Sequence, residues 1–591
     1  MQSHHRTAVE AFARPSSPRS RGTPRLAAPL ARVRSAAATL TVAFATLAAG
    51  ITSVHAQSAC DGPLAASGAV VRFLTQATFG PTREDICALA RMVEREGSEA
   101  EAFEAWIDQQ LRMPATPLAD HFDPDSGNYQ HSLSRRLAWF EAAVGAPDQL
   151  RQRLAFALSE LFVVSEKDGT LSRREGQVGL QRYYNMLLAH AFGDYRALIE
   201  RVTFDPVMGH YLTVVRSQAA TGPDGAQPDE NYAREILQLM SIGLDLLRPN
   251  GQPRLDRDGN RIPTFDQDTI LAFARAFTGL NYDLGEVDDN PCRGWAGRGT
   301  DFTRPMVLCD RFHDHGEKRL LAESSSAAII PAGQGAERDI RDALDNIAGH
   351  PNVSPFLARR LIERFVTSNP SPAYIRRVAD AFDNSGGNLG ATVKAVLLDD
   401  EARSERVADR DYAGKMREPL LLVTGLWRAF DGSLEGLDPR IARIEPFGQS
   451  PQASPSVFNF FQPEYQPAID TSAVRLPAYI EDSGLYAPEM QVMTELATIQ
   501  THNDLRVLIH GNASQVPLAL DDELAMLRRT PEELVSHLDQ LLLAGTMSEA
   551  LHTAIARVIE SPATNSEWPL RQRLYDILYL IVTSPEFAVQ R

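Results

Sequence analysis

One polar segment of the sequence holds several side chains suited to acid–base or metal chemistry. Residues 228–235 read PDENYARE and precede the apolar run ILQLM. Asp229, Glu230 and Glu235 offer carboxylates that can hold a metal ion or transfer a proton. We therefore predict Glu230, Arg234 and Glu235 as catalytic candidates. The alternative is structural, with Asp229 as the N-cap of a helix and Glu230 paired with Arg234 one turn later.

A second polar segment, residues 312–318, reads FHDHGEK. Imidazoles beside a carboxylate are typical ligands of a transition metal. We predict His313 and Asp314 as metal ligands together with Asp229 and Glu230, so a divalent metal is the cofactor to test. The alternative is a histidine that anchors the loop. If the two segments converge, they form one carboxylate–histidine cleft.

Common catalytic motifs are missing from the sequence. There is no G-x-S-x-G, no H-E-x-x-H, no P-loop and no G-x-G-x-x-G between a strand and a helix. The first two absences weigh against the commonest serine hydrolases and zinc peptidases. Any chemistry must then come from side chains that the fold brings together.

The elements that must position these side chains are mostly helices. Thr82 and Asp85 are spaced as a capping box, as are Thr530 and Glu533 around a proline. Apolar residues at helical spacing predict a helix after Thr82 and further helices at 151–164, 183–190, 197–202, 268–277, 340–348, 355–367, 373–383, 391–398 and 531–543. The expected fold is mainly α, a large multi-helix globular body with long ordered loops.

One segment breaks the helical pattern. Residues 247–265 contain Asn250-Gly251 and Asp258-Gly259, which are turn dipeptides of β-hairpins. We predict a small β-hairpin inserted in the helical body. We expect a main helical domain at 57–420 and a C-terminal loop and helical extension packed on it at 421–591.

The first 56 residues differ from the rest. They hold seven arginines and one glutamate, then an uncharged run of small and apolar residues that ends in Val54-His55-Ala56. This order is that of a secretory signal peptide, so we predict a signal peptide at 1–56 and export to the periplasm or the exterior. The alternative is a membrane anchor, although the run is weakly apolar. We expect no stable membrane span after cleavage.

The net charge restricts the partners. The chain carries a formal charge of −17, and the leader is net positive with seven arginines against one glutamate, so the mature protein is more acidic still. An acidic protein attracts neither nucleic acid nor anionic lipid. We therefore expect no nucleic-acid role.

Four cysteines stand outside the leader. Export favours disulfides, and Cys292 and Cys309 flank a loop rich in glycine, aspartate and arginine. We pair these two, and by remainder Cys60 with Cys87. The alternative is four free thiols. Their spacing fits no zinc site.

Segments along nearly the whole mature chain together resemble the bacterial domain-of-unknown-function family 1800. They are RFLTQATFGPT (72–82), LSELFVVS (158–165), HAFGDYRALIERVTFDPVMGHYL (190–212), PDENYAREILQLMSIGL (228–244), IPTFDQDTI (262–270), AFTGL (276–280), FHDHGEK (312–318), HPNVSPFLARRLIERFVTSNPSPAYIRRVADAF (350–382), KMREP (415–419), SPSVFNFFQPEY (454–465) and SPEFAVQR (584–591). Met240 and Leu280 stand where the family commonly has phenylalanine and tryptophan. The resemblance implies an exported bacterial protein and supplies no catalytic residues.

Two functions remain open from the sequence. The first is an exported enzyme, metal-assisted, that acts on an unknown substrate through the carboxylate–histidine cleft. The second is a non-catalytic secreted or envelope-associated protein that binds an exported partner through an apolar patch. Phe458, Phe460, Phe461 and Tyr465 are the aromatic run that could form such a patch, and burial in the core is the other interpretation of that run.

Overall fold

The computed structural model describes residues 67–591, apart from 124, 126, 223–224, 286–289, 291, 293–294, 296–298, 405–412, 433–447, 468–483, 511–517 and 562–566. The predicted signal peptide and Cys60 lie outside the described residues. Contacts between residues group Gln57–Arg591 as one compact unit. All elements below belong to this unit.

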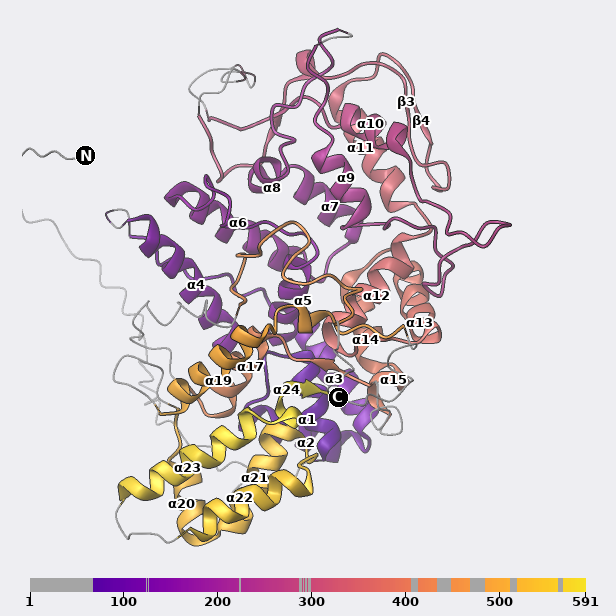
Figure 1. Cartoon of the computed structure of the whole chain (residues 1–591). Coiled ribbons are helices and arrows are strands. Elements are labelled where there is room, and N and C mark those ends of the chain that lie inside the picture. The colour runs from indigo at the N-terminus through magenta and orange to yellow at the C-terminus, as the bar shows by residue number, and fades with distance from the viewer. Residues whose placement is uncertain are drawn as a thin grey trace, which may run out of the picture. The chain divides into compact units, whose positions relative to one another are not determined.

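Helices dominate the described residues, as predicted (Figure 1). The first half of the chain contains α1 (Gly68–Ala77), α2 (Arg83–Glu96), α3 (Glu99–Arg112), α4 (Asn128–Gly145), α5 (Gln149–Ser159), α6 (Arg174–His190), α7 (Tyr195–Thr203), α8 (Pro206–Tyr211), α9 (Asn231–Gln238) and α10 (Gln267–Ala276). The second half contains α11 (Ala336–Ala348), α12 (Val353–Phe365), α13 (Pro372–Asn384), α14 (Leu389–Leu398), α15 (Asp400–Arg403), α17 (Pro419–Ala429), α19 (Glu495–His510), α20 (Asp521–Arg529), α21 (Pro531–Leu543), α22 (Glu549–Glu560), α23 (Glu567–Val582) and α24 (Pro585–Ala588).

Strands are short and pair in twos. The antiparallel pairs are β1 (Leu280–Asn281) with β2 (Val307–Leu308), β3 (Lys318–Arg319) with β4 (Ile329–Ile330), and β5 (Lys415–Met416) with β6 (Val589–Gln590). Among the described residues, two 3₁₀ helices are η1 (Asp310–Phe312) and η4 (Pro488–Gln491). The β5–β6 pair joins the last residues to the middle of the chain.

Local signals explain some helix boundaries and fail at others. Thr82 and Asp85 form the predicted capping box of α2. Thr530 precedes α21, but its side chain makes no capping hydrogen bond, so that capping box was wrong although the helix is confirmed. The helix predicted at 151–164 begins at Gln149 and ends at Ser159. Its apolar run continues beyond Ser159 without a glycine or proline, so nothing local marks the end.

The predicted hairpin forms as an irregular antiparallel ribbon. Residues 244–264 fold back twice, at Gly251 and Gly259, both of which have positive φ. Isolated bridges join Asp245 to Pro263, Leu247 to Pro253 and Leu255 to Arg261. Prolines lack the N–H that a continuous ladder needs, so regular strands do not develop.

Aromatic side chains hold α4, α5 and α17 together in the core. Trp139 and Trp427 are at most 2% exposed. Trp139 packs edge-on against Phe79 at 5.3 Å between centroids, and Trp427 packs edge-on against Phe140 at 5.3 Å. Such pairs add to the stabilisation from burial of large rings. Trp139 also packs against Phe156 of α5 at 5.5 Å, so α4 links α5 and α17, the two helices next to the site described below.

The loop before α2 touches α17 so closely that only glycine fits. Gly80 has φ +114°, and a Cβ there would lie 2.4 Å from Gly425 Cα. We expect Gly80→Ala to lower the free energy of unfolding by roughly 2–4 kcal/mol, from backbone strain and overpacking. Urea denaturation of Gly80→Ala and of the wild type measures this difference in the free energy of unfolding. Gly386→Ala is the control, because Gly386 also has positive φ but its Cβ would meet open space. Equal losses in both variants would contradict the steric explanation.

Within the part of the chain that the structure describes, helices fall short of the length and apolar content that a membrane crossing needs.

Candidate active site

The site begins with a carboxyl group at the end of a helix. Glu160 is the C-cap of α5 and is 6% exposed. The C-terminus of a helix carries partial negative charge, which disfavours an ionised carboxylate. Burial acts in the same direction. Glu160 is therefore placed where its neutral form is preferred.

A second carboxyl group lies at the opposite kind of helix end. Glu418 is the N-cap of α17 and is fully buried. The partial positive charge of a helix N-terminus favours its ionised form. The two carboxyl groups hydrogen bond to each other. The Gln449 side-chain amide donates to Glu160 at 3.2 Å and to Glu418 at 2.8 Å, and so holds both in place.

Cations surround the pair. Arg364 Nε lies 3.4 Å from Glu160 Oε2, and Lys415 Nζ lies 3.3 Å from Glu418 Oε1. Lys415 also pairs with Glu489 at 3.0 Å. Arg153 donates to the Arg364 carbonyl at 2.7 Å. We call these seven side chains the buried carboxylate cluster: Arg153, Glu160, Arg364, Lys415, Glu418, Gln449 and Glu489.

The two carboxyl groups have opposite pKa shifts. Burial and the nearby Glu418 together raise the pKa of Glu160 to about 8, against the opposing effect of Arg364. Burial alone would also raise the pKa of Glu418, but Lys415 and Arg364 lower it to about 2. Two like charges in contact cannot both ionise easily, so the pair retains one proton at neutral pH. Glu160 carries that proton.

A cavity of about 90 Å³ gives access to Glu160. Its walls come from α5, α9, α12 and the loop 457–463. Arg360 and Arg364 of α12 and Gln238 of α9 supply polar groups to the lining. Space of this size holds a few water molecules or one small substrate group. The protonated carboxyl group is thus close to a place where a ligand can sit.

The loop contributes the remaining lining. Asn459 is 7% exposed and has φ +66°, an uncommon conformation that asparagine tolerates. Its Nδ2 is buried and has no acceptor among the described residues. Phe461 is buried and stacks under the Arg364 guanidinium at 4.5 Å, whereas Phe458 is 43% exposed. Both rings line the cavity, and Phe458 is also exposed at the surface.

The predicted catalytic residues lie on the neighbouring helix α9. Glu230 accepts from Arg234 at 2.9 Å, the ion pair expected one turn apart, and from Gln267 at 2.7 Å. Asp229 accepts from the Asn231 backbone N–H at 2.9 Å, but the residue at the N-cap position is Glu230. These contacts fit the structural alternative for Glu230 and Arg234.

Glu235 differs from its neighbours. It is 6% exposed, and its Oε2 has no hydrogen-bond partner among the described residues. Burial raises its pKa, although Arg234 lowers it. The cavity lining includes Gln238, one turn further along α9, rather than Glu235. The predicted polar side of α9 therefore reaches the cavity only at its end.

The predicted metal ligands of the second segment have partners of their own. Buried His313 contacts Asp339 at 3.0 Å through Nε2 and the Thr278 carbonyl at 3.0 Å through Nδ1. Asp314 binds Arg275 through both oxygens, at 2.8 and 3.0 Å. These contacts support the interpretation that the histidine anchors its loop.

Two hydrogen bonds to Ser217 link the two predicted segments. Ser217 accepts from the Asp229 N–H at 3.0 Å through Oγ and from the Gly279 N–H at 2.9 Å through its carbonyl, and Gly279 lies beside His313. Over the described ranges, no three His, Cys, Asp or Glu side chains are grouped to hold a metal. Metal binding by Asp229, Glu230, His313 and Asp314 stays a prediction.

The cysteines give a mixed result. Cys292 and Cys309 are both buried, and both are free thiols in the structure. Burial and a hydrogen bond with Cys292 raise the pKa of Cys309 to about 12. The two sulfur atoms are therefore neighbours without being bonded. The pairing of Cys60 with Cys87 stays a prediction because Cys60 lies outside the described residues.

Sequence reasoning missed the buried carboxylate cluster. The signal in the sequence was a charged residue within an apolar run or next to one. Arg153 and Glu160 lie in RLAFALSELFVV, and Glu418 precedes PLLLV. A charge in such a run must be paired or neutralised when the helix is buried. The partners lie at positions as distant as 364 and 489, so no spacing rule connects them.

Comparison with known proteins identifies a family but no relative of known activity. Neither the curated proteins nor the solved structures contain a match. The family model described as "Protein of unknown function (DUF1800)" matches residues 72–589, nearly the whole chain. The matched range includes every residue of the buried carboxylate cluster, and the protein belongs to this family of unknown function.

Proposed function

We propose that the protein is an enzyme that uses Glu160 as a general acid. The observation that carries this proposal is a buried carboxyl group that lines a cavity, and burial and Glu418 raise its pKa to about 8. A perturbed carboxyl group in a concave site is a physical indicator of acid–base chemistry. An acid whose pKa lies near neutrality is efficient because it is protonated and still transfers its proton readily.

The surrounding groups have complementary roles. Glu160 donates its proton to a substrate oxygen in the cavity. Glu418 stays ionised. It keeps the proton on Glu160 in the resting state, and it stabilises the protonated form of Glu160 again after turnover. Asn459 Nδ2 and Arg364 are donors that can orient the substrate oxygen. Gln449 and Lys415 are positioning residues, because they hold the carboxyl groups and do not line the cavity.

Charge indicates the substrate class. With Glu160 neutral, the three cations of the cluster face two ionised carboxylates, Glu418 and Glu489. One excess positive charge therefore remains beside the cavity, and a small substrate group with a carbonyl or anionic oxygen is favoured there. Phe356, Phe458 and Phe461 supply an apolar wall for the rest of the substrate.

The test is a set of chromogenic esters and glycosides assayed from pH 5 to 9 with the wild type, Glu160→Gln and Glu337→Gln. We expect turnover that falls as pH rises through about 8, because Glu160 loses its proton there. Glu160→Gln should lose at least a hundredfold in kcat, and Glu337→Gln, an exposed control, should match the wild type. Wild-type turnover retained in Glu160→Gln would overturn the proposal.

A second candidate is the binding protein predicted as the alternative. The observation in its favour is exposed apolar surface on α19, where Leu496 is 65% and Ile499 62% exposed. Such residues on one helix are suited to contact with an exported partner protein. Chemical crosslinking of the wild type and Leu496→Asp in its source cell would distinguish this function, since only the wild type should capture a partner.

We also propose that the protein is exported after cleavage near Ala56. The basic, apolar and small-residue order of the leader supports this. Intact mass of the protein from cells should correspond to a chain that begins near Gln57. A full-length chain in the soluble cytoplasmic fraction would contradict export.

Export leads to a prediction for the thiols. We expect Cys292 and Cys309 to form a disulfide in the exported protein, because their side chains are neighbours. Once the protein is folded and reduced, the raised pKa of Cys309 leaves little thiolate, so alkylation at pH 8 should be slow. Mass spectrometry of peptides before and after reduction detects the link. Alkylation of both Cys292 and Cys309 in the unreduced, denatured protein would show that the disulfide is absent.

A further inference from the structure

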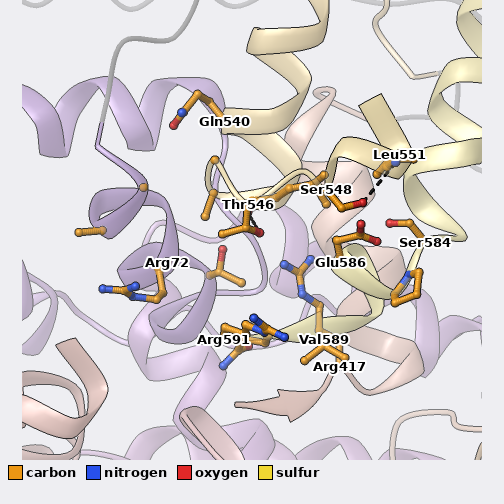
Figure 2. A pocket seen from close by; sticks show the side chains of 18 of the residues that line it. Arg72, Arg417, Gln540, Thr546, Ser548, Leu551, Ser584, Glu586, Val589 and Arg591 are labelled. Atoms are coloured by element: carbon orange, nitrogen blue, oxygen red, sulfur yellow. Dashed lines mark hydrogen bonds between the residues drawn. The ribbon is translucent and has the colours of Figure 1, made fainter. Parts of the chain in front are cut away.

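A larger cavity, lined by other residues than the buried carboxylate cluster, is bounded by Arg417, the residue that follows β5 (Figure 2). Its volume is about 970 Å³, within the range of pockets that hold small organic ligands. The walls come from α1, the turn between α21 and α22, α24, β6 and the residue after β5, Arg417. None of the groups proposed for proton transfer lines it.

Arg417 is the unexplained group in this cavity. Its backbone N–H donates to Ala588, and its guanidinium lies over the Phe587 ring at 4.9 Å. Its Nε is buried without an acceptor. Burial lowers its pKa to about 10, so it remains charged at neutral pH. In the part of the chain that the structure describes, no carboxylate lies within ion-pair distance of this cation.

The neighbours of Arg417 favour a negative ligand. Figure 2 shows Arg72, Arg417 and Arg591 along one side of the cavity, below the turn with Thr546 and Ser548. Ser548 caps α22 by accepting from the Leu551 N–H, so the positive end of that helix also faces the cavity. The one acid of the lining, Glu586, is engaged by hydrogen bonds from Ser548 and Ser584 that lower its pKa.

The lining also contains apolar side chains. Leu543 and Leu551 approach from α21 and α22, and Val589 from β6. A bare inorganic ion would leave most of the 970 Å³ empty. An organic molecule can place an acidic head at the arginines and an apolar body against these side chains.

We propose that this cavity is a binding site for an organic anion with a carboxylate or phosphate head and an apolar body. Arg417 binds the head through charge-assisted hydrogen bonds, with Arg72 and Arg591 adding to the positive potential. The site is separate from Glu160 and does not depend on the protein being an enzyme.

Isothermal titration calorimetry of the mature protein tests the proposal with four probes: octanoate, octyl phosphate, inorganic phosphate and octyltrimethylammonium. We expect the two amphiphilic anions to bind and the cation of the same tail not to bind. Inorganic phosphate should bind at least tenfold more weakly than octyl phosphate. Equal affinity for octyl phosphate and inorganic phosphate would overturn the apolar part of the proposal. An affinity for octyltrimethylammonium equal to that for octyl phosphate would overturn the anion site.

Two variants with opposite expected effects assign the site. Arg417→Gln should weaken octyl phosphate binding at least tenfold, since a charge-assisted hydrogen bond is lost. Glu586→Gln should strengthen it severalfold by removing a like charge, and this result remains informative if Arg417→Gln does not fold. Arg571→Gln, in an exposed ion pair on α23, is the control. Unchanged affinity in Glu586→Gln together with unchanged affinity in a folded Arg417→Gln would refute the site.

Discussion

Replacement of Glu160 by glutamine is expected to stabilise the protein at pH 8 by several kcal/mol while leaving its stability near pH 4.5 almost unchanged. The wild-type carboxyl group has a folded pKa of about 8 against 4.5 in the unfolded chain. Between these values the folded state binds the proton and the unfolded state does not. Stability therefore falls as pH rises through this window, by up to about 1.4 kcal/mol per pH unit.

Glu418 contributes the opposite slope at lower pH. Its folded pKa of about 2 lies below the unfolded value, so its contribution is present above pH 4.5 and is lost as pH falls toward 2. The pair thus gives a stability maximum near pH 4.5. Glu160→Gln should lack the decline toward pH 8, and Glu418→Gln should lack the rise from pH 2.

Urea denaturation at intervals from pH 3 to 9 measures these slopes as differences from the wild type. Titrating groups outside the carboxyl pair contribute nearly equally to both proteins and cancel, whereas the contribution of Glu418, which is coupled to Glu160, is measured separately with Glu418→Gln. Glu337→Gln, which removes a carboxylate from an exposed ion pair with Arg341, is the control. A difference for Glu160→Gln that does not change between pH 4.5 and 8 would show that this carboxyl group is ionised in the folded protein.

A second large effect is expected at Glu166. It accepts from Arg135 at 2.6 Å, from Ser132 at 2.8 Å and also from Arg136, and all three charged side chains are buried. Glu166→Gln leaves two buried guanidinium groups without their counter-charge. We expect a loss of roughly 3–5 kcal/mol in the free energy of unfolding, typical for removal of one member of a buried pair.

The same change should disturb the candidate site. Arg135 donates to the Pro451 carbonyl at 2.9 Å and to the Gln452 side chain at 3.0 Å, so this ion network holds the loop between Gln449 and Asn459. Denaturation at pH 7 gives the stability, with Glu200→Gln as the control for an exposed pair, at about 0.5 kcal/mol or less. A loss as small as in that control would mean that the buried arginines find other partners.

Much of the fold could be predicted from the sequence because helix signals are local. The capping box at Thr82, the Asn-Gly and Asp-Gly turns and the helical spacing of apolar residues depend on a few neighbouring residues. The end of α5 could not be predicted, because LSELFVV contains no local stop. Because α5 ends at Ser159, Glu160 is a helix C-cap rather than an interior residue. No local signal in the sequence marks this boundary, although it matters most for the site.

The candidate site could not be predicted for a related reason. Polar clusters such as PDENYARE and FHDHGEK attract attention because their residues are adjacent, and adjacent residues often satisfy one another, as Glu230 and Arg234 do. The buried carboxylate cluster brings together residues that are far apart in the sequence, from helices, a strand and a loop. The role of each depends on partners that only the folded chain supplies.

The long sequence separations within that cluster have a consequence for folding kinetics. Residues from position 153 to position 489 must meet before Glu160 is dehydrated, so this event belongs to a late, non-local step. At pH 6 that step takes up one proton from the medium for the carboxyl pair. A pH-indicator dye in a weakly buffered refolding experiment would therefore time the closure of this region separately from helix formation, which circular dichroism follows.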